Sequence, residues 1–307
     1  MTNFKFWKVL IANRGEIALR IQKTCNKLKI PCAITVSEAD IKSYFARNAD
    51  FAAGLKGYTA HESYLNQDLI IKTAKELKCN AIHPGYGFLS ENSKFAAKVK
   101  ESGLIFVGPS SESIYALGDK AKAREIAERC KVPLTKGTAA DLNNAELLKE
   151  SERIGFPLLI KAVAGGGGRG MRVVNNKKEI EEQLILARAE AKKNFLDERV
   201  YLEEYILNPR HVEVQVIADN HGNFLHLGTR DCSTQRRHQK LTEEAPAPDL
   251  SASLRRSLHN AAIQIAKAAA YNSAGTAEFL VYGEKFSFLE MNTRIQVEHP
   301  VTEEITG

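Results

Sequence analysis

The chain has 307 residues, 44% of them hydrophobic and 26% charged, and it carries a formal net charge of +6. These values are typical of a globular protein with room for two or three domains, and the mild positive charge suits anionic ligands such as nucleotides. Because the sequence holds neither a dense Lys/Arg tract nor an apolar run of membrane-spanning length, we expect no nucleic-acid partner and no membrane partner.

Two further features of the sequence predict a cytoplasmic location. The N-terminal segment becomes charged after a short apolar stretch, which is not the pattern of a secretory signal. The five cysteines show no CxxC spacing, as expected of reduced thiols.

The first hundred residues alternate between short apolar runs and amphipathic segments. Residues 8–13 (KVLIAN) predict a strand, and the apolar positions behind them recur at helical spacing. The alternation continues to residues 104–108 (LIFVG), which predicts an open parallel sheet covered on both faces. Ligands bind such sheets at the carboxyl ends of the strands, where residues 13–15 (NRG) and 83–88 (HPGYGF) are expected to lie.

The remaining residues follow different patterns. Residues 156–175 predict a strand, a glycine loop and a second strand, and a charged helix and a further strand follow. Two hairpins, separated by a helix near residues 254–270, predict an antiparallel sheet after that. We therefore expect an α/β protein with a parallel-sheet domain at 1–118, linker helices and a small α/β unit at 119–205, and an antiparallel unit at 206–307.

The glycine loop at residues 165–170 (GGGGRG) is the first chemical signal. Glycine weakens a strand interior, whereas its backbone N–H groups can close over phosphates. The loop lacks the GK[ST] of a Walker loop, and it joins two strands, unlike a dinucleotide fingerprint. A loose surface hairpin is the alternative. Lys161, on the preceding strand, favours the phosphate role, although such a lysine can also reach into solvent.

Two glutamates in the second hairpin are the next signal. A three-residue turn at 283–285 would place Glu278 directly opposite Glu290, whereas a two-residue turn would put them on opposite faces. Opposed carboxylates repel, so the first register favours a magnesium ion between them, with Asn292 supplying another oxygen. The alternative is a pair of solvent-facing glutamates.

Residues 290–300 (EMNTRIQVEHP) alternate between polar and mainly apolar side chains. In an extended chain, the even-numbered residues from Glu290 to Glu298 would share one face. Eight extended residues span roughly 26 Å, so the chain must bend if both ends serve one site. The polar face is either a solvated surface or the working surface of an enzyme.

Six segments, in order along the chain, carry a family resemblance: 11–21 (IANRGEIALRI), 83–92 (HPGYGFLSEN), 165–174 (GGGGRGMRVV), 208–216 (NPRHVEVQV), 230–248 (RDCSTQRRHQKLTEEAPAP) and 290–303 (EMNTRIQVEHPVTE). They closely resemble the biotin carboxylases, which are ATP-grasp ligases. These are the ATP-dependent components of the acetyl-CoA carboxylase of fatty acid biosynthesis and of the propionyl-CoA, 3-methylcrotonyl-CoA and pyruvate carboxylases. The resemblance implies an N-terminal parallel-sheet domain followed by an ATP-grasp lid and central domain.

The resemblance also implies an ATP site with a metal ion. Its residues are Lys120 and Lys161 at the phosphates, Gly167 and Gly168 in the flap, Glu203, Glu204, Tyr205 and Ile206 at the adenine hinge, and His238, Glu278 and Glu290 near the nucleotide. Magnesium or manganese would be held by Glu278, Glu290 and Asn292. The family often has a basic residue in place of Glu204, a difference of small weight if the backbone makes the adenine contact.

By the same resemblance, the polar face of residues 290–298 is a reaction surface. Bicarbonate would be surrounded by Lys240, Arg294, Gln296 and the backbone of Val297. Glu298 is implied as the general base, with Arg294 beside it as a fixed cation that would lower its pKa. His211 and Gln235 match positions associated with biotin, which is a carrier-bound substrate and is not attached to this chain.

The resemblance implies partners and leaves alternatives open. A biotin carboxyl carrier protein and a carboxyltransferase are the expected partners, and the family is homodimeric. The family continues beyond residue 307, so we expect the isolated chain to leave a sheet edge unpaired and to be poorly stable. The alternatives are another bicarbonate-activating ATP-grasp ligase of the carbamoyl-phosphate type, and a non-catalytic nucleotide-binding module.

Overall fold

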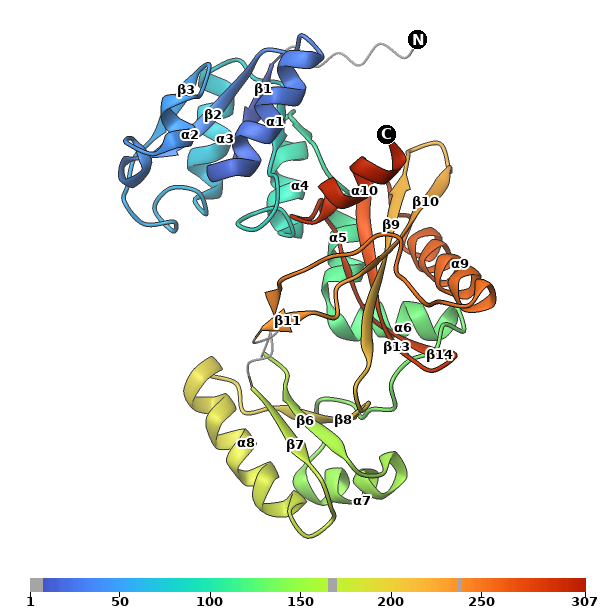
Figure 1. The fold of residues 1–307 in the computed structure, drawn as a ribbon. Coiled ribbons are helices and arrows are strands. Elements are labelled where there is room, and N and C mark those ends of the chain that lie inside the picture. The colour runs from blue at the N-terminus through green and yellow to red at the C-terminus, as the bar shows by residue number, and fades with distance from the viewer. Residues whose placement is uncertain (1–7, 165–169, 237–238) are drawn as a thin grey trace.

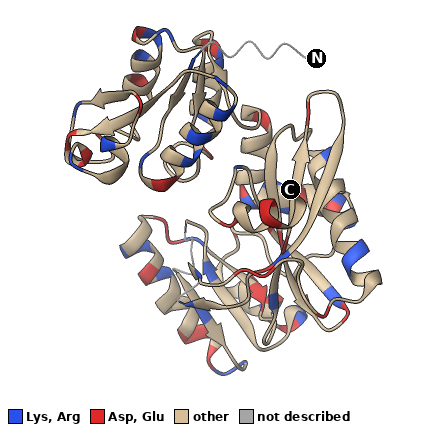
Figure 2. Cartoon of the chain, turned by 45° about the horizontal axis from the view of Figure 1, so that its top comes forward, with Lys and Arg blue, Asp and Glu red and all other residues tan. Residues whose placement is uncertain are grey.

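Three larger sheets, each with its own helices, and one two-stranded sheet make up the computed structural model, which describes residues 8–164, 170–236 and 239–307. In Figure 1 the N-terminal sheet lies at the top, a small α/β unit at the bottom, and the central antiparallel sheet between them toward the right. Basic and acidic residues are interspersed over the helices of these units (Figure 2). Among the described residues, no helix is long and apolar enough to cross a membrane.

The N-terminal sheet is parallel, as the sequence predicts, with strand order β3-β2-β1-β4-β5. Its strands are β1 (Val9–Ile11), β2 (Cys32–Ser37), β3 (Ala52–Leu55), β4 (Ala81–His83) and β5 (Ile105–Phe106). The intervening helices are α1 (Gly15–Lys27), α2 (Tyr44–Arg47), α3 (Gln67–Glu76) and α4 (Ser93–Glu101), with a 3-10 turn at Glu38–Asp40. Every residue of β1 and β2 is buried, because helices cover both faces.

Two short helices lead from this sheet into a small α/β unit. They are α5 (Ser111–Gly118) and α6 (Lys120–Arg129). The unit, called the lid below, holds strands β6 (Leu158–Ala162), β7 (Met171–Val174) and β8 (Val200–Glu204), covered by α7 (Asn144–Ile154) and α8 (Ile180–Phe195). Alternate residues of β6 are buried, so Lys161 faces away from the lid core that Ile160 enters.

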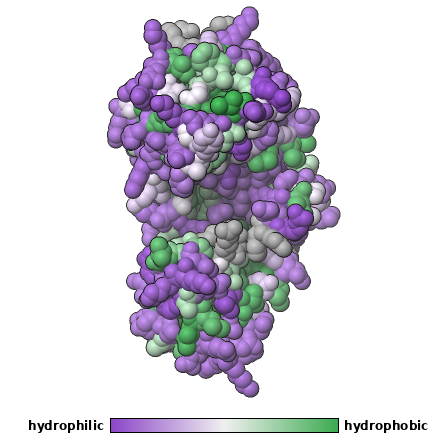
Figure 3. Space-filling view, turned by 90° about the vertical axis from the view of Figure 1, so that its left-hand side faces the viewer, coloured by the Kyte–Doolittle hydropathy of each residue, from purple (hydrophilic) through white to green (hydrophobic). Residues whose placement is uncertain are grey.

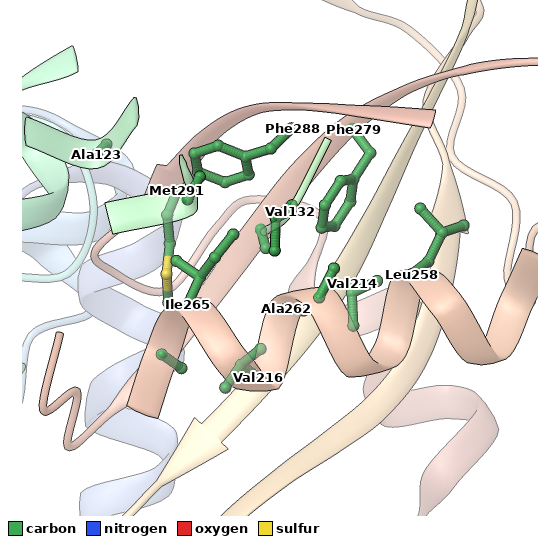
Figure 4. Packing of buried hydrophobic residues seen from close by; sticks show 14 of the residues in the cluster. Ala123, Val132, Val214, Val216, Leu258, Ala262, Ile265, Phe279, Phe288 and Met291 are labelled. Atoms are coloured by element: carbon green, nitrogen blue, oxygen red, sulfur yellow. The ribbon is translucent and has the colours of Figure 1, made fainter. Parts of the chain in front are cut away.

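The central unit is a four-stranded antiparallel sheet of order β10-β9-β13-β14. Its strands are β9 (Arg210–Ala218), β10 (Phe224–Asp231), β13 (Ala274–Tyr282) and β14 (Lys285–Asn292), and a short pair, β11 (Gln235–Arg236) and β12 (Gln239–Lys240), lies between β10 and helix α9 (Ala252–Ala268) in the chain. Leu258, Ala262 and Ile265 of α9 pack against Val214 and Phe279 of the sheet (Figure 4). This apolar layer leaves the opposite sheet face for polar side chains.

The hairpin of β13 and β14 has the predicted pairing of Glu278 with Glu290, but its turn differs from the prediction. Tyr282 pairs with Lys285, so the turn has two residues, and the prediction of a three-residue turn is wrong. The register then shifts by one residue between Glu278 and Phe279, a β-bulge that gives β14 an extra residue. The bulge returns Glu278 to a position directly opposite Glu290.

The polar segment after this hairpin is not extended throughout. Strand β14 ends at Asn292, and helix α10 (His299–Thr306) begins directly after Glu298. The prediction of one continuous alternating face to residue 298 is therefore wrong, and the bend that it required occurs between these two elements. Turning the chain here brings Glu298 back over the sheet face that carries Glu278.

Candidate functional site

Lys240 joins three carboxylates on the polar face of the central sheet. Its Nζ lies 2.6 Å from Glu213 Oε2, 2.9 Å from Glu278 Oε1 and 2.7 Å from Glu298 Oε1. The Lys240 side chain is 19% exposed, and those of Glu278 and Glu298 are less than 10% exposed. Burial disfavours the ammonium ion, but the three carboxylates outweigh it and raise the pKa of Lys240, which stays charged.

Glu213 links this lysine to a fully buried arginine. Its Oε1 accepts a 2.6 Å hydrogen bond from Arg230 Nε, and neither side chain is more than 1% exposed. Arg230 Nη1 also donates to Gln215 Oε1 at 2.9 Å and to Thr302 Oγ1 at 2.6 Å. A buried charge requires such partners, and here they come from β9 and α10.

His211 and Gln235, the residues matched to biotin, are brought together beside Glu278. The amide Nε2 of Gln235 lies 3.3 Å from His211 Nδ1. His211 Nε2 lies 2.9 Å from Glu278 Oε2 but off the direction of a linear hydrogen bond, so the contact is electrostatic. Burial disfavours the imidazolium, yet Glu278 outweighs it and raises the pKa of His211. The same contact and Lys240 overcome burial to lower the pKa of Glu278.

Glu278 and Glu290 could hold a divalent cation. They pair directly across β13 and β14, and burial followed by the charge of Glu278 raises the pKa of Glu290. Two opposed carboxylates supply the oxygen ligands that such ions prefer, so this donor set fits magnesium or manganese. Asn292 donates to Glu278 (2.6 Å) while its Oδ1 accepts from Arg294 (3.0 Å), so it would have to turn to become a ligand. Lys120 Nζ lies 3.9 Å from Glu290.

Arg294 is held by a residue that the sequence analysis did not single out. Its Nε donates to Glu91 Oε2 at 2.8 Å, and the other oxygen of Glu91 accepts from the backbone N–H of Thr293 at 3.1 Å. The expected pairing of Arg294 with Glu298 is therefore wrong for this structure, in which Lys240 takes that position. Glu91 follows strand β4, so this contact joins the N-terminal domain to the segment after β14.

The lid contributes a second buried ion pair. Lys161 Nζ lies 2.8 Å from Glu203 Oε2, with side chains 16% and 7% exposed, and Glu203 Oε1 accepts from Thr135 Oγ1 at 3.1 Å. Glu204 uses its backbone N–H and its side chain to bond the backbone of Lys136. The expected hinge thus continues from the end of β8, and Tyr205 and Ile206 follow it directly.

Of four further predicted site residues, the structure describes one, Val297. Val297 is 62% exposed, as a backbone contact to a ligand would allow. Gly167, Gly168 and His238 lie outside the described residues.

Figure 3 shows the surface hollowed between the N-terminal unit above and the lid below, with mainly hydrophilic residues lining the hollow.

Residues 13–15 (NRG) and 83–88 (HPGYGF) take part in hydrogen bonds within the N-terminal domain. Asn13 Nδ2 donates to the backbone oxygens of Pro84 (2.6 Å) and Tyr86 (2.8 Å). Arg14 forms a two-pronged contact with Asp40, and this hydrogen bonding holds the pKa of that carboxyl below its usual range. Because these polar groups bond one another, the motifs order the carboxyl ends of the strands.

Sequence reasoning missed three buried or bridging charges: Glu91, Glu213 and Arg230. Each lies inside a segment quoted for the family resemblance, but none was given a role. The available signal was Glu213, an acid between valines in the strand sequence HVEVQV, where a charge requires a buried partner.

Two family profiles together match nearly the whole chain. Residues 5–114 match the profile described as the biotin carboxylase N-terminal domain, and residues 119–307 match that described as the carbamoyl-phosphate synthase L chain, ATP binding domain. A lid followed by a central antiparallel sheet with opposed carboxylates defines the chain as an ATP-grasp protein. The chain belongs to the biotin carboxylase family.

Curated relatives and solved structures agree with this assignment. The mitochondrial methylcrotonoyl-CoA carboxylase subunit alpha of Rattus norvegicus is 49% identical over 302 residues, which is 98% of this chain and 42% of that protein. Pyruvate carboxylase of Staphylococcus aureus (strain Mu50) is 49% identical over 303 residues, 98% of this chain and 26% of that protein. The chain thus spans less than half the length of these relatives.

Two solved structures share the fold over 98% of this chain. A biotin carboxylase–β-γ-ATP complex from Campylobacter jejuni has a TM-score of 0.92 at 46% identity, with 68% of that chain covered. The biotin carboxylase domain dimer of Hydrogenobacter thermophilus 2-oxoglutarate carboxylase has a TM-score of 0.90 at 44% identity, with 67% covered. That structure is a complex with MgADP, ADP and bicarbonate.

Proposed function

We propose that this chain catalyses the first half-reaction of a biotin-dependent carboxylase. ATP phosphorylates bicarbonate to carboxyphosphate, and the carboxyl group passes to biotin on a carrier protein. The observation that carries the proposal is the contact of Lys240 with Glu298 and Glu278, because it joins an anion-binding cation, a candidate base and a candidate metal ligand.

In this proposal Glu298 is the general base and Lys240 helps to bind bicarbonate. Glu298 takes the proton from bicarbonate as a bicarbonate oxygen attacks the γ-phosphate and ADP leaves. Lys240 has three protons, and each is engaged by a carboxylate, so an arriving bicarbonate oxygen must replace one of these contacts. Glu213 and Glu278 can give up this contact at lower cost than Glu298, because Glu213 keeps Arg230 and Glu278 keeps His211 and Asn292 as partners.

The remaining assignments follow the same proposal. Arg294, fixed by Glu91, would bind the bicarbonate anion and later the enolate form of biotin. The biotin contacts are proposed for His211 and Gln235, which lie next to one another. Gln296 and the backbone of Val297 would complete the bicarbonate site.

The nucleotide site is proposed at the lid and the opposed carboxylates. Lys120 and Lys161 would bind phosphates, and the backbone of the hinge after Glu203 would bind adenine. Glu278, Glu290 and Asn292 would hold magnesium or manganese. When bound, the ion would neutralise phosphate charge during the transfer.

The decisive experiment measures ADP release by the chain with magnesium and bicarbonate, with and without free biotin. We expect release that biotin stimulates, and a loss of at least about a hundredfold in Glu298→Gln, as for removal of a general base. Nucleotide binding should survive in that variant. ATP binding by the unaltered chain without bicarbonate-dependent ADP release would contradict the proposal for this chain.

A second candidate is a ligase of the carbamoyl-phosphate type. The description of the profile matched by residues 119–307 favours it, since it names carbamoyl-phosphate synthase. Such an enzyme would also activate bicarbonate, but ammonia rather than biotin would stimulate its turnover. The N-terminal profile, described as that of biotin carboxylase, supports the first candidate.

The partners proposed are a biotin carboxyl carrier protein and a carboxyltransferase, together with a second copy of the chain. The relatives named above are larger carboxylases, and one structural neighbour is a biotin carboxylase domain dimer, which supports these partners. A cytoplasmic location stays a prediction from the sequence.

A further inference from the structure

Five side chains form a closed ring of contacts beneath the proposed bicarbonate site. Lys240 contacts Glu213 at 2.6 Å and Glu278 at 2.9 Å. Glu213 accepts from Arg230 at 2.6 Å, and Arg230 Nη2 donates to Gln296 Oε1 at 2.8 Å. Gln296 Nε2 lies 3.3 Å from Glu278 Oε1, which closes the ring.

Arg230 is a fully buried member of this ring. It is 1% exposed, so it cannot touch a substrate in this structure. Its guanidinium contacts acceptors on β9, β13, α10 and the segment after β14: Glu213, Gln215, Thr276, Thr302 and Gln296. An arginine with so many fixed acceptors has one orientation available to it.

That orientation decides which end of the Gln296 amide faces the reaction surface. A guanidinium only donates hydrogen bonds, so the side of Gln296 that meets Arg230 must be the acceptor, Oε1. The NH2 group is then directed toward Glu278 Oε1, which also accepts from Lys240. An anion requires donors, and a reversed amide would present it with an oxygen.

We propose that Arg230 is a positioning residue for bicarbonate: it holds the Gln296 amide with its NH2 group toward the anion and, through Glu213, holds Lys240 on the same side. This inference rests on the proposed function and assigns to that site a residue that makes no contact with substrate.

The test compares Arg230→Lys with the unaltered chain in bicarbonate-dependent ADP release. A lysine keeps a cation beside Glu213 but lacks the fork that reaches Gln296 as well. We expect the KM for bicarbonate to rise about 10- to 100-fold, the range for loss of one charged hydrogen bond, while nucleotide binding changes less than about twofold. Arg255→Lys is the matched control, because Arg255 bonds Thr229 and the backbone of Ala247, outside the ring.

A double variant separates positioning from general distortion. With Gln296→Ala there is no amide to orient, so adding Arg230→Lys should raise the KM for bicarbonate by less than about threefold. An increase as large as in the single variant would overturn the inference. If the unaltered chain shows no bicarbonate dependence in any assay, the proposed function fails, and the inference fails with it.

A measurement on the unaltered chain covers the case in which Arg230→Lys does not fold. The side-chain NH2 resonance of Gln296 can be identified in a ¹⁵N spectrum by its loss in Gln296→Met. Titration with sodium bicarbonate in the presence of MgADP should shift this resonance. Bicarbonate binding at the site that leaves the resonance unmoved would overturn the inference while the proposed function stands.

Discussion

Replacing Lys240 with methionine removes the cation shared by three buried carboxylates and should destabilise the fold. Methionine preserves much of the side-chain volume, so the effect reports the charge. Glu213 keeps its contact with Arg230 at 2.6 Å, and Glu278 keeps His211 at 2.9 Å. Among the described residues, Lys240 is the only cation in an ion pair with Glu298, so the variant leaves that carboxylate unpaired.

The expected loss in the free energy of unfolding depends on how many of the three carboxylates keep another partner. Removing one member of a buried ion pair costs about 3–5 kcal/mol. Two of the three carboxylates retain partners and the Lys240 side chain is 19% exposed, so we expect the lower end, about 3 kcal/mol. For a domain of this size, that corresponds to a fall in Tm of roughly 6–12 °C.

The assay is urea and thermal unfolding at pH 7.5, followed by circular dichroism. Lys177→Met is the control, because Lys177 pairs with Glu152 at 72% exposure and should change stability by less than about 0.5 kcal/mol. A loss below about 1 kcal/mol for Lys240→Met would refute the reasoning.

Two further predictions concern other parts of the structure. Glu278→Gln should lower the pKa of His211, which can be measured by NMR titration of the imidazole. Because Glu278 raises this pKa above the unfolded value of about 6.5, the contact stabilises the fold fully below pH 6.5, and the stabilisation is lost as the pH rises through the folded value. An unchanged pKa of His211 in the variant would contradict the assigned cause. Asn13→Ala leaves two backbone oxygens without their donor and should cost about 2–3 kcal/mol in urea unfolding; a change under about 0.5 kcal/mol would show that water replaces the amide.

The local elements could be predicted from the sequence because their signals are local. The alternation of apolar runs with helical spacing identified the parallel sheet, and the glycine loop and the two hairpins identified the lid and the central sheet. The opposition of Glu278 and Glu290 was predicted correctly but for the wrong reason. A two-residue turn and a bulge together give the same pairing as a three-residue turn, and sequence periodicity does not distinguish the two.

The family motifs placed most candidate residues on the polar side of the central sheet, but only the tertiary structure decided how they are paired. Lys240 rather than Arg294 meets Glu298, and Glu91, from the N-terminal sheet, meets Arg294. Arg230 acquires its place in the ring from acceptors 15 to 72 residues away. The local sequence pattern determines which face of a helix or strand is apolar. A buried charge must be paired with a neighbouring polar or charged group, and distant segments supply that group only once the chain has packed, so the tertiary structure decides the partner.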